Sequence, residues 1–172
     1  MNIFYELLFS RAIQKILMLK ISNFYQYITN TLYVTSGHSM DPTVKHDELL
    51  IVSPCLTNPY NPHRGDIVVV GNRGDHRMLK RVIGLPCEYI KLSEGLLYIN
   101  SVQISEYYLN GLPSSSSSST FEWYLNPDEI LVLGDNRSRS TDSRSFGPVK
   151  LNDILGKVLF RYWPLSRLRV LK

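Results

Sequence analysis

The sequence predicts a mainly β protein, in which a β-rich domain follows a helical membrane anchor at the N-terminus. Short runs of Val, Ile and Leu alternate with Gly, Pro and short polar links, as is typical of strands and turns. The chain has 11 Tyr, which favours β structure. The runs follow one another too closely for βαβ crossovers. With 172 residues, the chain is long enough for one domain and a short anchor.

Residues 1–35 are predicted to form a membrane anchor or a membrane-associated helix. The window 21–40 contains no Lys, Arg, Asp or Glu, and it is about as long as a membrane-spanning helix. Arg11, Lys15 and Lys20 precede it, which predicts an N-terminus on the inner side. Polar residues interrupt the window, so an amphipathic helix lying on the membrane surface is the alternative.

Residues 36–172 are predicted to form the β-rich domain. Residues 93–95 (Ser-Glu-Gly) indicate a hairpin turn, and residues 114–120 are seven consecutive hydroxyl residues, typical of a flexible loop. Pro164 is expected to end the last strand. The predicted strands are 49–52, 66–70, 78–83, 88–92, 96–99, 130–133 and 154–162.

Charge and cysteine content narrow the function only slightly. The formal net charge of +4 suits either an anionic membrane surface or nucleic acid. Cys55 and Cys87 form neither a CxxC motif nor a Cys/His ligand spacing, so no zinc site is expected. We expect two separate thiols, and a single disulfide is the alternative.

The first candidate for chemistry is Ser39, in residues 36–43 (Ser-Gly-His-Ser-Met-Asp-Pro-Thr). Gly37 permits backbone angles that other residues avoid, and Pro42 fixes its own φ angle. Such a turn can present the Ser39 hydroxyl for attack and leave nearby N–H groups free. The alternative is an ordinary Ser/Gly/Pro turn.

The second candidate is Lys80, which we expect to act as the base for Ser39. It lies in a largely apolar strand, where Arg81 points to the opposite face. Burial would lower the pKa of Lys80 and let the neutral amine accept a proton from serine. One alternative is a solvated Lys80–Arg81 pair. Another is a Ser-His-Asp triad that uses one of the four histidines, His38, His46, His63 or His76.

The third candidate segment is residues 134–148, which is dense in charges of both signs and in short hydroxyl residues. Asp142 and Arg144 are expected to form a charge-assisted pair that fixes this loop. Ser140 could hydrogen-bond a neutral lysine and orient it. The alternative is a simple polar turn.

Together these segments resemble the type I signal peptidases, the membrane-bound Ser-Lys endopeptidases of bacteria, mitochondria and thylakoids. The four matching motifs occur in the family's order: residues 39–43 (Ser-Met-Asp-Pro-Thr), 64–69 (Arg-Gly-Asp-Ile-Val-Val), 80–86 (Lys-Arg-Val-Ile-Gly-Leu-Pro) and 134–147 (from Gly-Asp-Asn-Arg to Gly). The resemblance implies that Ser39 is the nucleophile and Lys80 the general base. It implies that Ser140 orients the lysine, and that Asp142 and Arg144 support the site.

The resemblance also implies a function. The family removes signal peptides from exported preproteins with small residues at positions −1 and −3, and it uses no metal or organic cofactor. Its domain rests on the lipid bilayer at the translocated side. The bacterial cytoplasmic membrane is expected, with the mitochondrial inner membrane and the thylakoid membrane as alternatives. No nucleic acid is expected as a partner, and association with a second peptidase subunit is compatible with the family.

Two positions depart from the family pattern. Gly37 replaces a serine whose hydroxyl helps the oxyanion hole in many bacterial members. The hole is then expected to use backbone N–H groups, those of Ser39 and Gly37. Cys87-Glu88 replaces the usual Gly-Asp, which puts the local turn in question.

Two other functions were weighed. A self-cleaving repressor of the LexA type shares a Ser-Lys dyad, but residues 1–35 are too few and too apolar for a helix-turn-helix module. A catalytically silent family member acting as an assembly partner is the other alternative. Loss of Ser39, Lys80 or Ser140 would favour it, and all three are present.

Overall fold

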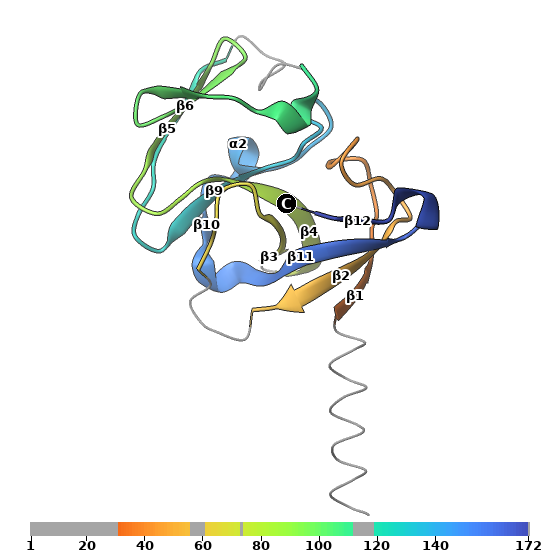
Figure 1. The fold of residues 1–172 in the computed structure, drawn as a ribbon. Coiled ribbons are helices and arrows are strands. Elements are labelled where there is room, and N and C mark those ends of the chain that lie inside the picture. The colour runs from red at the N-terminus through yellow and green to blue at the C-terminus, as the bar shows by residue number, and fades with distance from the viewer. Residues whose placement is uncertain (1–30, 56–60, 73, 112–118, 172) are drawn as a thin grey trace, which may run out of the picture.

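A computed structural model describes residues 31–55, 61–72, 74–111 and 119–171. These residues form two antiparallel sheets with a few short helical turns (Figure 1), so the predicted mainly β fold is confirmed. The predicted helix before residue 31 and most of the Ser-rich loop lie outside the described residues. No helix among the described residues is long and apolar enough to cross a membrane.

The larger sheet has eight strands in the order β1-β2-β11-β3-β4-β9-β10, and β12 pairs with β11. Strand β11 lies between β2 and β3, so a strand late in the chain joins two early ones. Its strands are β1 (Leu32–Val34), β2 (Leu49–Pro54), β3 (Ile67–Asn72), β4 (Gly74–Gly84), β9 (Glu129–Leu133), β10 (Val149–Lys150), β11 (Ile154–Trp163) and β12 (Arg169–Val170).

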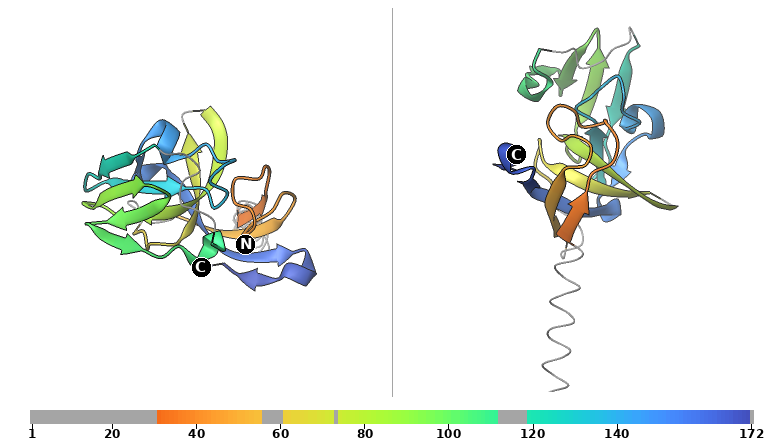
Figure 2. Two further views of the ribbon diagram at one scale, coloured as in Figure 1. Left: turned by 90° about the horizontal axis from the view of Figure 1, so that it is seen from above. Right: turned by 90° about the vertical axis from the view of Figure 1, so that its right-hand side faces the viewer.

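The smaller sheet has four strands in the order β7-β6-β5-β8. It projects from the β4–β9 side of the larger sheet, away from β1 and β2 (Figures 1 and 2). Its strands are β5 (Tyr89–Ser93), β6 (Leu96–Ile99), β7 (Val102–Ile104) and β8 (Phe121–Tyr124). The short helical elements are η1 (Tyr107–Leu109), α2 (Ser143–Phe146), η2 (Leu151–Asp153) and η3 (Leu165–Arg167).

The first four residues of strand β3, Ile67–Val70, are all apolar, and both faces of the strand are buried there. Ile67 and Val69 pack into one hydrophobic cluster, and Val68 and Val70 pack into another. A third cluster, which includes Ile83 of β4, joins the larger sheet to the smaller one. The core therefore holds β4 rigidly from both sides.

The structure contains all seven predicted strands, with bounds that differ by a few residues. One predicted boundary is wrong. The predicted anchor extended to residue 35, but Leu32–Val34 form strand β1, because they pair in register with Leu49–Ile51 of β2. Strands β7, β8, β10 and β12 were also not predicted.

Two turns explain local details of the sequence. Glu94 and Gly95 both have positive φ angles, which confirms the predicted hairpin turn between β5 and β6. Cys87 adopts a φ of 63°, so the turn persists although glycine is absent there. Glu88 stabilises the same turn by accepting a hydrogen bond from Leu85 N at 2.7 Å. Cys55 and Cys87 are free thiols, as expected.

Candidate active site

Ser39 lies in the loop between β1 and β2, which one threonine closes at its base. Thr35 N donates to Glu48 O at 2.9 Å, and Glu48 N donates back to Thr35 Oγ1 at 2.9 Å. Inside the loop, Met40 and Val44 are buried, and Val44 N donates to Met40 O at 2.9 Å. Ser39 therefore precedes a short, well-packed turn that is anchored in the core.

Lys80 projects from β4 towards this serine. Ser39 Oγ and Lys80 Nζ lie 3.3 Å apart, and Lys80 Nζ also donates to Leu79 O at 3.1 Å. The Lys80 side chain is only 3% exposed, and burial lowers its pKa, although the negative charge of Asp142 opposes the shift. As predicted, Arg81 points to the opposite face of the strand, where it pairs with Asp135. The structure thus brings the predicted nucleophile and base together.

The third predicted segment packs directly against the nucleophile. Asn136 N donates to Ser39 O at 3.0 Å. A Cβ atom on Gly134 would lie 2.2 Å from Ser140 Oγ and 2.5 Å from Ser39 O, so this position has room only for glycine. Ser140 Oγ is buried, and its interaction with the Asp142 carboxylate helps to lower the pKa of Asp142. The structure thus brings Ser140 close to Ser39, but its role in orienting Lys80 stays a prediction.

Asp142 and Arg144 form the expected pair, and it is bidentate. Arg144 Nε donates to Asp142 Oδ1 at 2.8 Å and Nη2 to Oδ2 at 2.9 Å. Gly134 N donates to the same carboxylate at 2.9 Å, and Arg144 Nη2 donates to Arg137 O at 2.7 Å. Burial alone would raise the pKa of Asp142, but the hydrogen bonds from Arg144 and Gly134 outweigh it and lower that pKa. The pair therefore closes the loop that contacts Ser39.

A second buried ion pair supports the same loop and was missed at the sequence level. Arg81 Nε and Nη2 donate to the two oxygens of Asp135 at 2.8 and 2.7 Å. Arg81 Nη1 donates to Gly65 O at 2.7 Å, and its guanidinium lies 4.2 Å from the Tyr108 ring centroid. Asp135 belongs to the Gly-Asp-Asn-Arg motif at residues 134–137, and this motif is the feature of the sequence that could have pointed to Asp135 as a site residue. Its partner lies 54 residues away, too far for any local pattern to reveal.

The two predicted oxyanion donors differ in their surroundings. Gly37 N donates to His46 Nδ1 at 3.1 Å, and Gly37 has a φ of 89°. The Gly37 N–H can therefore donate to an oxyanion only after its hydrogen bond to His46 Nδ1 breaks. No hydrogen bond from Ser39 N is found among the described residues. The composition of the oxyanion hole stays a prediction, and Ser39 N is the donor that is free to take part.

The alternative of a histidine base gains no support from the described residues. Three histidine side chains lie next to acidic neighbours: His38 next to Asp41, His46 next to Asp47 and His63 next to Asp66. None of these three makes a hydrogen bond with Ser39. The described residues also contain no group of three His, Cys, Asp or Glu side chains that could hold a metal ion.

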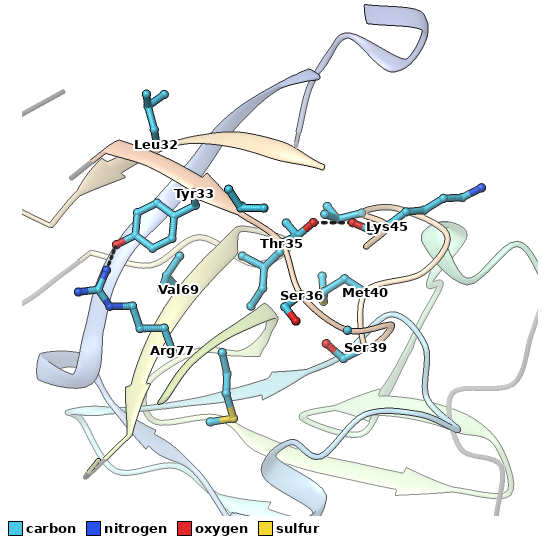
Figure 3. A pocket seen from close by; sticks show the side chains of 14 residues that line it. Leu32, Tyr33, Thr35, Ser36, Ser39, Met40, Lys45, Val69 and Arg77 are labelled. Carbon is cyan, nitrogen blue, oxygen red and sulfur yellow. Dashed lines mark hydrogen bonds between the residues drawn. The ribbon is translucent and has the colours of Figure 1, made fainter. Parts of the chain in front are cut away.

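A pocket of about 280 Å³ lies beside Ser39 (Figure 3). Its far end is bounded by Tyr33 and Arg77, which are hydrogen-bonded to each other at 3.2 Å. Met40, Val69 and other apolar side chains form much of its wall. The complete lining is Leu32, Tyr33, Val34, Thr35, Ser36, Gly37, Ser39, Met40, Val44, Lys45, Val69, Arg77, Met78 and Leu79.

A β-rich domain with a serine hydroxyl against a buried lysine defines a class of serine hydrolases. Residues 9–163 match the family model described as signal peptidase, peptidase S26, and the chain belongs to this family. The predicted family and the predicted serine endopeptidase activity, removal of signal peptides, are therefore confirmed.

Individual relatives agree with this assignment. The chain is 38% identical over 146 residues to signal peptidase I of Bacillus caldolyticus, covering 78% of this chain and 80% of the relative. It is 33% identical over 157 residues to signal peptidase IB of Staphylococcus aureus, covering 81% of each. A crystal structure of a signal peptidase I from Enterococcus faecalis superposes with a TM-score of 0.50 at 34% identity, covering 57% of this chain and 97% of that one. None of these relatives is a repressor of the LexA type.

Proposed function

We propose that this chain cleaves signal peptides from preproteins with Ser39 as nucleophile and Lys80 as general base. The observation that carries the proposal is the 3.3 Å contact between Ser39 Oγ and the Nζ of a buried lysine. Because burial lowers the pKa of Lys80, more of its amine is neutral at a given pH than in a solvated lysine. A neutral amine at this distance can accept the hydroxyl proton.

The reaction then follows acyl transfer. Ser39 Oγ attacks the scissile carbonyl carbon while its proton moves to Lys80 Nζ, and the carbonyl oxygen becomes an oxyanion near Ser39 N. Lys80 returns the proton to the leaving amine as the peptide bond breaks. A water molecule, deprotonated by the same amine, attacks the acyl ester and frees the signal peptide and Ser39. Ser140, Asp142 and Arg144 support Lys80 and the loop beside it.

We propose that the pocket beside Ser39 receives the side chains at positions −1 and −3 of the substrate, which are small in substrates of the signal peptidase family. It is about 280 Å³ in all, and it is shared between the edge strand β1 and residues 77–79 of β4. In an extended peptide, residues −1 and −3 point to the same side. Residues −1 and −3 can therefore both enter this one pocket, whose wall includes the apolar side chains of Met40, Val69 and Leu79. The outer edge of β1 offers backbone groups to such a peptide.

We also propose that the domain works at a lipid bilayer, in the bacterial cytoplasmic membrane and on its translocated side. Six exposed apolar residues lie on β1, the C-terminal end of β11, β12 and the η3 region, and these strands are neighbours or next neighbours in one sheet. They are Leu32, Val34, Trp163, Leu165, Leu168 and Val170. The absence of Lys, Arg, Asp and Glu from residues 21–31 supports an accompanying anchor that ends before β1. The role of a second subunit stays a prediction.

The test is cleavage of a preprotein with an Ala-X-Ala site in detergent. We expect the intact chain to cleave, and Ser39→Ala and Lys80→Ala each to lose about a thousandfold or more in kcat. The activity of the intact chain should fall as acid protonates Lys80. Activity that survives Lys80→Ala would refute the dyad and favour a histidine base. An intact chain that cleaves nothing would favour the catalytically silent homologue.

A further inference from the structure

The loop that carries Ser39 is held from its far side by side chains from the C-terminal part of the chain. Arg167 Nη2 donates to Pro42 O at 2.8 Å and lies 3.4 Å from Thr43 O. Arg161 Nη1 donates to Thr43 O at 2.6 Å. These contacts span 118 to 125 residues of sequence, and they reach carbonyls only three and four residues after the nucleophile.

One buried carboxylate joins these arginines to the base of the loop. Glu48 is 2% exposed; its Oε2 accepts from Arg161 Nη1 at 3.0 Å and from Lys45 N at 3.0 Å. Its Oε1 lies 2.7 Å from Arg167 Nη1. Arg161 Nε also donates to Arg167 O at 2.7 Å, which fixes the backbone that carries Arg167. The cluster therefore ties β11 and η3 to the nucleophile loop.

The two arginines are not equivalent. Thr43 O keeps a donor at 2.6 Å in Arg161 if Arg167 is removed, whereas Arg167 is the donor found for Pro42 O among the described residues. Pro42 lies inside the turn closed by the Val44 N to Met40 O hydrogen bond. Because this turn begins at the residue after Ser39, a displaced Pro42 carries Ser39 with it.

We propose that Arg167 is a positioning residue for the reaction: by holding the carbonyl of Pro42, it keeps the Ser39 hydroxyl at its working distance from Lys80. This role rests on the dyad proposed above. Arg167 touches none of the residues predicted to react. Its side chain is 28% exposed, so it is partly accessible, and its function is to hold the loop rather than to fill the core.

The test compares Arg167→Ala and Arg167→Lys with Arg169→Ala in the full chain in detergent. Arg169 is a matched control, because it is an exposed arginine two residues away for which no side-chain hydrogen bond or ion pair is found among the described residues. Cleavage of an Ala-X-Ala preprotein is followed at a temperature at which circular dichroism shows every variant folded. The readouts are kcat, KM and the acid limb of the pH profile of kcat/KM.

We expect Arg167→Ala to lower kcat by roughly tenfold to a hundredfold, as for a reacting atom misplaced by about 1 Å. KM should change less, because Arg167 does not line the pocket beside Ser39. The acid limb should move to higher pH, because a displaced Ser39 lets water reach Lys80 and its pKa rises, with Asp142 still favouring the charged amine. Arg167→Lys should give an intermediate kcat and an intermediate acid limb, because a single ammonium group replaces the guanidinium and its several N–H donors. Arg169→Ala should match the native chain in both readouts.

A folded Arg167→Ala variant with native kcat and a native acid limb would overturn the proposal. A loss of stability without these changes would also overturn it, because a merely structural role predicts that pattern. If Arg167→Ala does not fold, Arg167→Lys decides by the same two readouts. Ser39→Ala is measured alongside: cleavage by that variant refutes the dyad itself, whatever the Arg167 variants do.

Discussion

At the scale of single residues, the site depends on two close approaches. Lys80 approaches Ser39 through burial in a strand, and this could be inferred from the apolar residues around it. Gly134 lets Ser140 and the backbone of Ser39 come together, and nothing in the local sequence shows this need. A glycine in a polar loop usually indicates a turn, whereas here the absent side chain makes room for the Ser140 hydroxyl and the backbone carbonyl of Ser39.

Gly134→Ala is expected to lower kcat about a hundredfold, because the new Cβ collides with Ser39 O, which is backbone and cannot rotate away. Gly71→Ala is the control. A Cβ there lies 3.3 Å from the flexible side chain of Leu155, which can move slightly. Cleavage assays on both variants check this, with circular dichroism to confirm folding. Equal activity of the two variants would contradict the close approach at Gly134.

At the scale of elements, strand β4 carries two neighbouring basic residues with opposite tasks. Its one face presents Lys80 without a tight carboxylate partner, and its other face presents Arg81 in a bidentate ion pair with Asp135. The alternation of a strand separates a base that must lose its proton from a cation that must keep it. A shift of one residue in the register of β4 would exchange the faces on which Lys80 and Arg81 lie.

Arg81→Met is expected to lower the free energy of unfolding by about 3–5 kcal/mol, because it leaves the Asp135 carboxylate buried and unpaired. The double variant Arg81→Met with Asp135→Leu should recover much of this loss. Urea unfolding followed by circular dichroism measures both. Lys91→Ala, which removes an exposed pair with Glu122, is the control and should change little. A double variant no more stable than the single one would contradict this account.

The elements that the sequence predicted are those with two buried faces or a strong apolar run, such as β3 and β11. It missed β1, β7, β8, β10 and β12, because short strands at the edges of the sheets carry no such run. The serine, the lysine and the Asp142–Arg144 pair were found, since each lies in a recognisable local motif. The Arg81–Asp135 and Glu48–Arg161 pairs were not, because their partners meet only after the chain has folded.

At the scale of the whole molecule, exposed apolar residues and the nucleophile share one region of the larger sheet. Leu32 and Val34 lie on β1, directly before the Ser39 loop, and also line the pocket beside it. The smaller sheet extends to the opposite side (Figure 2). A substrate bound along β1 would therefore lie next to the surface that we propose contacts lipid.

Trp163→Ser combined with Leu165→Ser should weaken binding to phospholipid vesicles about tenfold, because two large exposed apolar side chains are lost. Cleavage of a short soluble peptide should stay unchanged, since neither side chain lines the pocket beside Ser39. Co-sedimentation with vesicles checks the first expectation. Tyr124→Ser, on the smaller sheet, is the control, because it removes an even more exposed ring far from this surface. Equal binding by all variants would place the lipid contact elsewhere.

The closure of the Ser39 loop by Thr35 has a mechanical consequence. Force applied to the chain before Leu32 enters the domain through β1, and the hydrogen bonds between Thr35 and Glu48 pass it directly into β2 and the sheet. The twelve residues between Thr35 and Glu48, which include Ser39, lie outside this direct connection. We therefore expect tension on the chain before Leu32 to change the distance between Ser39 and Lys80 only slightly.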